Sequence, residues 1–301
     1  MVRTYDHHDF DPLTLLEAKG SQRISVCLPA RNEQTTVGTI VGRLREALVT
    51  RVPLVDEIIV MDDNSSDATA RIAKEAGAVV IDASTTLEDH GSGPGKGMAL
   101  WKSVYASTGD IVVWCDSDVT NFGPHFITGL LGPLLTNDDI AYVKGFYRRP
   151  LSAGDGGGRV TELVARPLLS MFFPELTSFI QPLSGEYAGR RWLLEGLPFV
   201  AGYGVEVGLL IDIATGWGNE VMAQVDLGTR LHRNRSLTEL GPQAMTITQV
   251  ILGRAMPGLV AQAAELIRPG LAPVEVHADE LPPMITVVPY AKNRASEESN
   301  K

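Results

Sequence analysis

The chain has 301 residues, of which 44% are hydrophobic and 21% charged, a composition typical of globular proteins rather than of disordered or fibrous ones. Its 26 basic and 36 acidic side chains give a net charge of −10, which argues against broad electrostatic binding of nucleic acid. A local basic pocket for a small phosphorylated ligand is compatible with that charge.

Three aspartates, Asp6, Asp9 and Asp11, stand near the N-terminus where a secretory signal would carry its apolar core. The longest segment free of Asp, Glu, Lys and Arg, residues 119–137, contains two prolines and several polar side chains, which makes it a poor membrane span. The two cysteines lie in apolar, strand-like runs without metal-type spacing, so we expect buried, inert thiols. The sequence predicts a cytoplasmic protein that binds neither membranes nor nucleic acid.

Residues 23–118 alternate strand-like and helix-like patterns. Strands are predicted at 23–28, 57–61, 78–81 and 110–115, helices at 37–48, 67–76 and 98–106, and a Gly-rich loop at 83–97. Thr35 or Thr36 is the expected N-cap of the first helix. Apolar strands separated by helices predict an α/β protein with a Rossmann-like, mostly parallel sheet and helices on both faces. Ligands bind such sheets at the carboxyl ends of the strands.

The second half of the chain is less regular. Strands are predicted at 141–147 and 221–231, a mobile loop at 152–158, and helices at 160–172 (interrupted at Pro167), 205–214 and 240–252. From Pro269 onward, Pro-rich and charged sequence predicts an extended arm whose last ten residues are disordered. We divide the chain into an N-terminal arm (1–22), a nucleotide-binding half (23–118), a second half of the same domain (119–240), and C-terminal helices with an extended tail (241–301).

The most specific local pattern is Asp116-Ser117-Asp118, directly after the fourth strand. Alternate side chains at a strand end point the same way, so Asp116 and Asp118 can address one ligand. Two hard carboxylates suit Mg²⁺ or Mn²⁺ that also bridges a ligand's phosphates. The alternative is a turn or helix-capping aspartate, which is common in such triplets; the position after the fourth strand favours the metal interpretation.

Polar residues also follow the first two strands. The first strand ends in Pro29, Ala30, Arg31, Asn32 and Glu33. After the second strand, Asp62 and Asp63 can accept hydrogen bonds from a base or ribose, whereas Ser66 and Asp67 are expected to cap the next helix. Lys96 lies in the run GPGKG; because Gly97 follows it, the P-loop signature is absent, but the lysine can still contact a diphosphate.

The second half offers an anion site and several ambiguous residues. Gly158, Arg159, Val160 and Thr161 begin a helix after a glycine run, which combines N–H donors, a favourable helix dipole and a guanidinium group. The alternative there is a linker with a solvated arginine. His232 is flanked by arginines and, from its sequence context, is more often a surface residue than a metal ligand. Glu206 near a helix start can favour the dipole or bind a sugar hydroxyl.

Taken together, the runs PARNE, DDNSSD, PGKG and DSD resemble the core of GT-A nucleotide-sugar glycosyltransferases. The runs GRVTEL with ARPLL, QPLSGEYAGRR, YGVE and HRNR are similar to the glucosyl-3-phosphoglycerate synthase family, retaining GT-A enzymes of actinobacteria and some other microbes. The similarity runs from about Ile24 to Leu240. It implies a GT-A fold with an acceptor-binding half and a C-terminal extension, and a homodimer.

The resemblance also implies a role for each matching residue. Pro29 to Glu33 would line the uridine pocket, and UDP-glucose would also contact Asp63, Lys96, Asp116, Ser117, Tyr203, Gly204, Val205, Glu206 and Arg230. Mg²⁺ or Mn²⁺ would be bound by Asp118 and His232, and 3-phosphoglycerate by Gly158, Arg159, Val160, Thr161 and Asn234. The catalytic candidates are Asp118, Lys96 and Glu206. The implied reaction transfers glucose from UDP-glucose to the 2-hydroxyl of 3-phosphoglycerate with retention of configuration.

The sequence leaves several alternative functions open. A close variant would use a GDP-sugar donor or glycerate as the acceptor. A sugar-1-phosphate nucleotidyltransferase is a different class, and the absence of a Gly-rich basic signature after the first strand argues against it. A binding module without turnover is disfavoured by the intact DSD run with Lys96 and His232. Because no carboxylate is placed as a nucleophile, we favour attack on the front face of the sugar, with Glu206 as the carboxylate to test.

Overall fold

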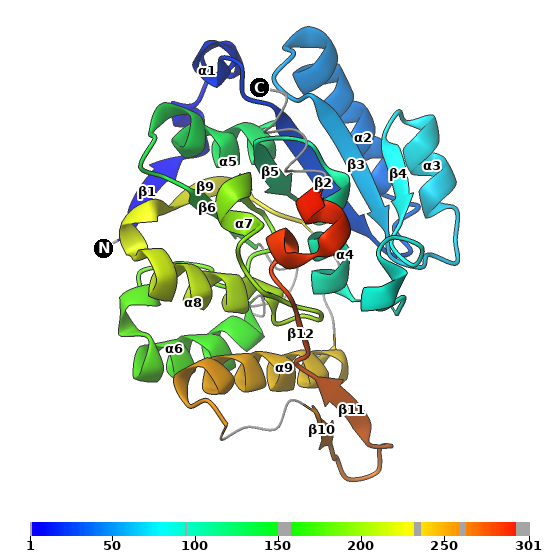
Figure 1. Ribbon diagram of the computed structural model, residues 1–301, viewed down its shortest axis with the longest axis vertical. Coiled ribbons are helices and arrows are strands. Elements are labelled where there is room, and N and C mark those ends of the chain that lie inside the picture. The colour runs from blue at the N-terminus through cyan, green and yellow to red at the C-terminus, as the bar shows by residue number, and fades with distance from the viewer. Residues whose placement is uncertain (1, 94, 150–157, 232–235, 259–262, 293–301) are drawn as a thin grey trace.

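An eight-stranded sheet forms the centre of the protein in a computed structural model that describes residues 2–93, 95–149, 158–231, 236–258 and 263–292 (Figure 1). The strands, in their order across the sheet, are β1 (Arg3–Asp6), β9 (Met222–Thr229), β6 (Tyr142–Arg148), β7 (Tyr187–Arg190), β5 (Ile111–Trp114), β2 (Ile24–Ala30), β3 (Glu57–Asp62) and β4 (Val79–Asp82). Within this sheet β7 alone pairs antiparallel to its neighbours. The predicted α/β class and mostly parallel sheet are confirmed.

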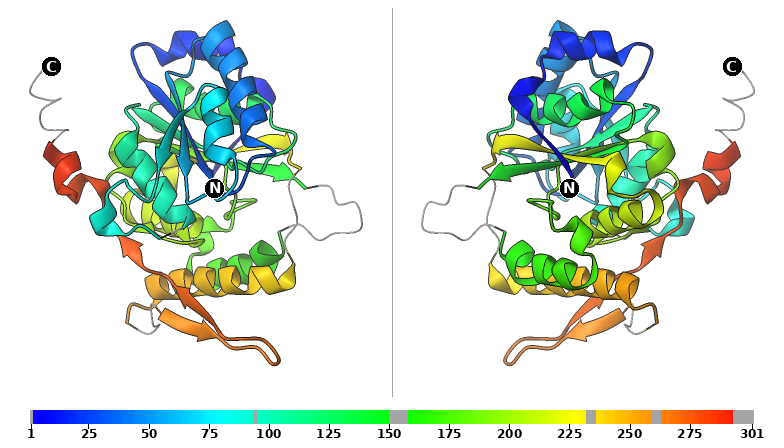
Figure 2. Two further views of the ribbon diagram at one scale, coloured as in Figure 1. Left: turned by 90° about the vertical axis from the view of Figure 1, so that its right-hand side faces the viewer. Right: turned by 90° about the vertical axis from the view of Figure 1, so that its left-hand side faces the viewer.

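Helices lie on both faces of this sheet (Figures 1 and 2). The α-helices are α1 (Pro12–Lys19), α2 (Val37–Leu44), α3 (Thr69–Glu75), α4 (Lys96–Ala106), α5 (His125–Thr136), α6 (Arg166–Phe172), α7 (Arg191–Leu194), α8 (Val205–Trp217) and α9 (Leu237–Ala255). Shorter or π-helical turns are η1 (His7–Asp9), η2 (Arg45–Arg51), η3 (Glu88–His90), η4 (Thr161–Ala165), η5 (Pro174–Leu176), η6 (Asn219–Val221) and η7 (Met284–Thr286). None of the helices in the described ranges combines the length and apolar character that a bilayer crossing needs.

Strand β5 shows why the sheet needs cover on both sides. Its four residues are fully buried and alternate between two hydrophobic cores. Val112 and Trp114 pack in the core that also contains α4 and α8, whereas Ile111 and Val113 pack in the core that contains α2 and α5. This period of two is the expected geometry of a strand buried on both faces. It fixes the direction in which the residues after β5 point.

The first half of the chain follows the sequence prediction closely. All four strands and all three helices exist, with ends shifted by a few residues. Cys27 and Cys115 are fully buried, and burial raises the pKa of the Cys27 thiol to about 12, as expected for inert thiols. Thr36 is the N-cap residue of α2, but its side chain does not cap the helix. Its hydroxyl donates instead to the carbonyl of Ser117, 2.6 Å away.

The second half of the chain differs more from the predicted secondary structure. The strands predicted at 141–147 and 221–231 and the helices at 205–214 and 240–252 are present, whereas α5 and β7 were not predicted. The helix expected over 160–172 is not broken at Pro167: the π-helical turn η4 leads directly into α6, where Pro167 is the second residue. Pro167, which has no N–H to donate, directly follows the π-helical turn, where the N–H of Arg166 bonds five residues back to Thr161. Residues 152–157, predicted as a mobile loop, lie outside the described residues.

The prediction of an extended arm after Pro269 is wrong for the residues that the structure describes. β10 (Ala263–Leu266) and β11 (Val274–His277) form an antiparallel hairpin, and β12 (Glu280–Leu281) pairs with β8 (Phe199–Val200). The indole nitrogen of Trp101 donates to the carbonyl of Pro282 at 2.8 Å, and Met284 is fully buried. Figure 2 shows this segment running from the hairpin back along the body of the protein. Residues 293–301 lie outside the described residues.

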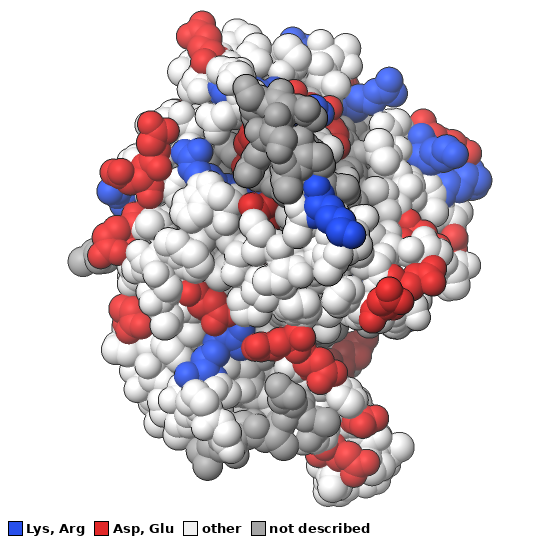
Figure 3. All heavy atoms as spheres, in the orientation of Figure 1, with Lys and Arg blue, Asp and Glu red and all other residues white. Residues whose placement is uncertain are grey.

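On the face seen in Figure 3, Lys and Arg occur in small groups separated by Asp and Glu. This distribution agrees with the net charge of −10. The face shown therefore offers no broad basic surface of the kind that binds a nucleic-acid backbone.

Candidate active site

A pocket of about 550 Å³ opens at the carboxyl ends of β2, β3 and β5. It is lined by 17 of the residues that the sequence singled out: Pro29, Ala30, Arg31, Asn32, Glu33, Asp63, Lys96, Asp116, Ser117, Asp118, Gly158, Arg159, Val160, Thr161, Tyr203, Glu206 and Arg230. These residues come from both halves of the chain. Parallel strands place their carboxyl ends at one edge, which is why segments far apart in sequence meet there.

The loop after β2 is shaped by the loop after β3. The backbone N–H of Asn32, a residue with φ of +58°, donates to the hydroxyl of Ser65 at 3.0 Å. The side-chain oxygen of Asn32 accepts from the backbone N–H of Ser66 at 2.8 Å, so Ser66 joins the two loops instead of capping the helix as predicted. Asp67 does accept from the backbone N–H of Thr69 at 2.9 Å, as expected for a residue at the start of α3. These bonds present the 29–33 segment to the pocket as one preformed edge.

Asp63 and Lys96 are connected through a glycine turn. Asp63 is 7% exposed and its two carboxylate oxygens accept from the backbone N–H of Gly95 at 3.2 and 3.1 Å. Asp62, the other candidate after β3, does not line the pocket. Gly97 must be glycine because a Cβ atom there would overlap the carbonyl oxygen of Val200. This close approach holds the first turn of α4, and with it Lys96, against the segment that follows β8.

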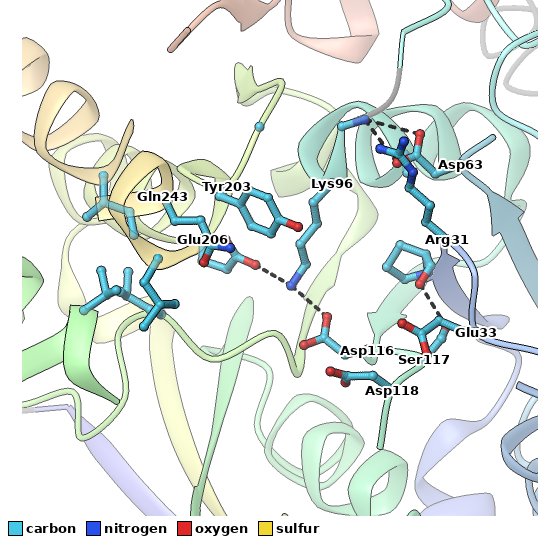
Figure 4. Close-up of a pocket in the computed structure, with 18 of the residues that line it drawn as sticks. Arg31, Glu33, Asp63, Lys96, Asp116, Ser117, Asp118, Tyr203, Glu206 and Gln243 are labelled. Atoms are coloured by element: carbon cyan, nitrogen blue, oxygen red, sulfur yellow. Dashed lines mark hydrogen bonds and ion pairs between the residues drawn. The ribbon is translucent and has the colours of Figure 1, made fainter. Parts of the chain in front are cut away.

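Lys96 lies between two carboxylates, as Figure 4 shows. Its ammonium is 2.7 Å from Asp116 and 2.6 Å from Glu206. Although burial disfavours the charged form, these two carboxylates hold the pKa of Lys96 well above its usual value. Burial likewise disfavours the charge on Asp116, but Lys96 and Arg230 hold its pKa well below the usual value. A fixed positive charge therefore lies at the centre of the pocket.

The Asp116-Ser117-Asp118 run has the predicted alternating geometry. Arg230, which is 3% exposed, donates to Asp116 at 2.9 Å and to Asp118 at 2.7 Å, so the two carboxylates face one point. The hydroxyl of Ser117 donates to the carbonyl of Pro29 at 2.8 Å and ties the run to β2. Arg230 also lies 3.0 Å from Glu186, a fully buried carboxylate that sequence reasoning missed. Glu186 contacts Nε of Arg230, whereas Nη2 of Arg230 contacts both aspartates. Glu186 therefore helps to fix the guanidinium group that neutralises Asp116 and Asp118.

A divalent cation fits the donors at this edge. Asp116 and Asp118 supply hard carboxylate oxygen atoms beside the nitrogen of Arg230 that contacts both of them, and Asp118 keeps 32% of its side chain exposed. Burial, together with the negative charges of Asp118 and Asp116, raises the pKa of Glu33 to about 7, which marks an excess of negative potential beside Asp118. His232, expected as the second metal ligand, lies outside the described residues.

This potential predicts a pH dependence of metal binding. A cation beside Asp118 favours the charged form of Glu33, so metal affinity should rise as pH increases through about 7, where Glu33 loses its proton. Calorimetric titration of Mn²⁺ between about pH 6 and pH 8 measures this slope. Glu33→Gln should flatten the slope of the titration curve; an unchanged slope in that variant would assign the dependence to another group.

The second half of the chain closes the other side of the pocket. Gly158, with φ of +76°, precedes a helical turn that contains Arg159, Val160 and Thr161 and continues into η4. The first turn of a helix presents N–H donors and the positive end of the dipole, and Arg159 adds a guanidinium group to the lining. The structure therefore brings the expected anion-binding residues to the same pocket as Lys96. Asn234 lies outside the described residues.

The stretch before α8 is only partly as expected. Tyr203 and Glu206 line the pocket, and Figure 4 shows them beside Lys96 and Gln243. Gly204 and Val205, which were also expected to contact the donor, are not among the residues that line the pocket. Val205 is fully buried in the core, and Gly204 packs so closely that a Cβ atom would lie 2.5 Å from the side chain of Val250 in α9.

Sequence reasoning missed three polar residues of this site. Arg149 lines the pocket directly after β6, and its charge helps to lower the pKa of Asp116. Polar residues at the carboxyl end of a parallel strand were the available signal, because β6 ends at the same edge as β5. Gln243 of α9 and the buried Glu186 carry no such signal, since their positions depend on the packing of distant segments.

A mostly parallel α/β sheet, with an aspartate pair at a strand end and a pocket that contains lysine and arginine side chains beside it, is the arrangement of a nucleotide-sugar glycosyltransferase of the GT-A type. Residues 25–198 match the model of glycosyl transferase family 2. The chain is 46% identical over 318 aligned positions to the glucosyl-3-phosphoglycerate synthase of Petrotoga mobilis, covering 99% of this chain and 98% of that protein. The chain belongs to the glucosyl-3-phosphoglycerate synthase family.

Solved structures support the same assignment. The glucosyl-3-phosphoglycerate synthase of Mycobacterium tuberculosis in complex with Mn²⁺, UDP-glucose and phosphoglyceric acid superimposes with a TM-score of 0.86 at 44% identity, covering 94% of this chain and 98% of that one. Its complex with Mn²⁺, UDP and glucosyl-3-phosphoglycerate gives a TM-score of 0.85 at 43% identity, covering 94% and 99%. These similarities establish the GT-A fold of this chain.

Proposed function

We propose that this protein transfers the glucosyl group of UDP-glucose to the 2-hydroxyl of 3-phospho-D-glycerate, with retention of configuration and release of UDP. The relatives named above carry this activity in their name and, in the mycobacterial structures, both substrates or both products. The observation that carries the proposal is that one pocket joins an acidic edge, a buried lysine and an anion-binding helix start. A donor diphosphate and a phosphorylated acceptor are both anionic, so both need cations or N–H donors within reach.

The donor is assigned to the edge formed by β2, β3 and β5. The 29–33 segment lines the uridine site, and the fixed charge of Lys96 faces the diphosphate. Arg230 holds Asp116 and Asp118 at one point, which preorganises the carboxylates before ligands arrive. A divalent cation, Mg²⁺ or Mn²⁺, bound by Asp118 and in our proposal by His232, supplies positive charge that stabilises the leaving UDP.

The acceptor is assigned to the helix start opposite. Its phosphate and carboxylate match the N–H donors of the 158–161 turn and the guanidinium group of Arg159, with Asn234 as a further donor in our proposal. This arrangement favours a phosphorylated acceptor over glycerate.

Arg159 provides a direct test of the acceptor assignment. Arg159→Ala should raise the KM for 3-phosphoglycerate by about ten- to a hundredfold, because a charge-assisted hydrogen bond contributes about 1.5–3 kcal/mol, and should change the KM for UDP-glucose little. Initial rates with each substrate varied in turn measure this difference. Arg166→Ala, which removes a half-buried arginine that is ion-paired to Glu162 and does not line the pocket, is the matched control. Equal effects of Arg159→Ala on both KM values would contradict the assignment.

Retention is assigned to attack from the front face of the sugar. Glu206, the carboxylate nearest the proposed sugar site, is ion-paired to Lys96 at 2.6 Å and is therefore suited to binding glucose hydroxyls. In the proposed step the acceptor 2-hydroxyl oxygen bonds to the anomeric carbon, the bond from that carbon to the phosphate oxygen breaks, and the departing phosphate takes the hydroxyl proton. Glu206→Gln should lower kcat without trapping a glucosylated chain in intact-mass spectra; a trapped adduct on wild-type Glu206 would contradict front-face attack.

A substrate matrix tests the proposed function as a whole. UDP- and GDP-sugars are combined with 3-phosphoglycerate or glycerate, with and without Mg²⁺, and products are identified by mass. We expect glucosyl-3-phosphoglycerate and UDP only with UDP-glucose, 3-phosphoglycerate and the metal. Pyrophosphate released from UTP and glucose-1-phosphate would instead identify a nucleotidyltransferase.

We further propose that the protein is a cytoplasmic homodimer. Support for the dimer comes from large apolar side chains exposed on the helices and hairpin beside α9, among them Leu163, Met171 and Ile267. Burying such side chains between copies would remove them from water. Light scattering during size-exclusion chromatography measures the mass of the assembly, and the mass of one chain would contradict the dimer.

A further inference from the structure

Two adjacent histidines and an aspartate form a cluster away from the pocket, where the edge strand β1 runs into η1. Asp6, His7 and His8 each offer a ligand atom, and these atoms lie within 4.8 Å of one another. Asp6 Oδ1 is 2.6 Å from Nδ1 of His8 and 3.3 Å from Nδ1 of His7. A further imidazole, that of His125 at the start of α5, has its ring 4.7 Å from that of His7. Imidazole with one carboxylate is a donor set that suits Zn²⁺ and related transition metals.

The backbone of β9 orients two of these imidazoles. Nδ1 of His7 is 2.9 Å from the carbonyl oxygen of Asp226, and His125 bonds to the backbone of Leu227. When Nδ1 of His7 donates to this carbonyl, the lone pair of the ring is on Nε2; an ion bound at Nδ1 would instead have to displace the proton and this bond. Histidine ligands in metal sites usually have such a partner, which fixes the tautomer and the ring orientation.

His7 packs closely against α5 and the end of β9, whereas its neighbours Asp6 and His8 are exposed to solvent. A Cβ atom at Gly129 of α5 would lie 3.1 Å from Cβ of His7, and one at Gly228, where φ is +80°, would lie 3.4 Å from Cε1 of its ring. His7 is accordingly 13% exposed, whereas His8 is 79% and Asp6 51% exposed. The cluster therefore combines one nearly buried imidazole with an exposed imidazole and an exposed carboxylate, that of Asp6, which also caps η1 by accepting from the backbone N–H of His8 at 2.9 Å.

We propose that Asp6, His7 and His8 bind a transition-metal ion, Zn²⁺ by their chemistry, at a site separate from the active site. The nitrogen-rich donors distinguish it from the carboxylate edge at Asp118, which suits Mg²⁺ or Mn²⁺. The ion would hold the end of β1 and η1 together, and the contact between Nδ1 of His7 and the carbonyl of Asp226 would carry this constraint to β9. Arg230 directly follows β9. The bound ion would therefore stabilise a strand that leads into the pocket, although the ion itself does not contact substrate.

Cobalt serves as the spectroscopic probe for this site. The full-length chain, without an affinity tag and stripped of metal, is titrated with Co²⁺ while excess Mg²⁺ and UDP occupy the active site. We expect one equivalent of Co²⁺ to give visible absorption bands of a nitrogen-ligated site, and one equivalent of Zn²⁺ to displace it and raise Tm. Activity with saturating Mg²⁺ should not change.

Variants locate the bound ion. His8→Ala, at an exposed position, should weaken Co²⁺ binding by more than about tenfold and abolish the Zn²⁺-dependent rise in Tm. His90→Ala is the matched control and should bind as the wild type does; His277→Ala should as well, although its side chain lies near two carboxylates. Unchanged binding in His8→Ala, or loss of binding in His277→Ala or Asp118→Asn, would overturn the proposal.

Discussion

Asp118→Asn is expected to lower kcat about a thousandfold while the chain stays folded, because losing about 4 kcal/mol of transition-state stabilisation has that effect. The amide keeps the size of the side chain but not the charge that attracts a divalent cation. Arg230 still has Asp116 and Glu186 as partners, so the buried charges remain paired. Steady-state rates across a Mg²⁺ series, together with thermal denaturation of the metal-free chain, measure both effects.

The control for this variant is Asp89→Asn, an exposed aspartate in η3. It should leave the rate and its dependence on Mg²⁺ unchanged. An Asp118→Asn enzyme that keeps the wild-type Mg²⁺ dependence would show that the cation is bound elsewhere.

Lys96→Met is expected to abolish turnover and also to destabilise the fold. The side chain of Lys96 is 17% exposed and that of Glu206 6%, so removing the ammonium leaves the buried carboxylate of Glu206 without its cation, whereas Asp116 keeps Arg230. Breaking a buried pair in this way costs about 3 kcal/mol or more. Activity is lost for a second reason, because the fixed charge near the diphosphate is removed.

A double variant separates these two effects. Lys96→Met with Glu206→Gln removes the unpaired charge on Glu206, so we expect it to recover part of the lost unfolding free energy but none of the activity. Denaturant unfolding and kcat, measured on both variants, give the comparison. Recovery of activity along with stability would show that Lys96 serves the fold alone.

The nucleotide-binding half was predictable because its signals are local. Each strand of that half is an apolar run followed by polar residues, and parallel topology alone brings those residues to one edge. The placement of Asp116 and Asp118 at one point follows from strand geometry, as Arg230 bridging both carboxylates confirms. Lys96 was identified as a pocket residue from its glycine-rich surroundings.

Elements that depend on distant partners were not predictable. β7 has only four residues, one of them Gly189, and exists because β5 and β6 pair with it on either side. β1 is a four-residue segment near the N-terminus that ends in Asp6, and it forms through pairing with β9, more than two hundred residues away. The C-terminal segment is polar and proline-rich, yet it is fixed by single contacts such as that between Trp101 and Pro282. The hydrophobic periodicity of the sequence does not indicate such long-range contacts.

Glu186 illustrates the same limit within the site. A charge flanked by Gly185 and Tyr187 gives no sign that it is fully buried, or that its partner is Arg230, 44 positions further along the chain. Burial raises the pKa of Glu186 while Arg230 opposes that rise, so the pair is stable only as a unit. Residues that position others are thus harder to predict than residues that line a strand end.

The most direct test of the account is the anomalous diffraction of Mn²⁺ in crystals grown with Mn²⁺, UDP-glucose and 3-phosphoglycerate. We predict an anomalous peak at the carboxylate of Asp118 and against the diphosphate, with the acceptor phosphate at the 158–161 turn. A donor bound with no Mn²⁺ peak beside Asp118, or an acceptor bound away from Arg159, would contradict the central claim that one pocket holds the metal-bound sugar nucleotide and the phosphorylated acceptor together.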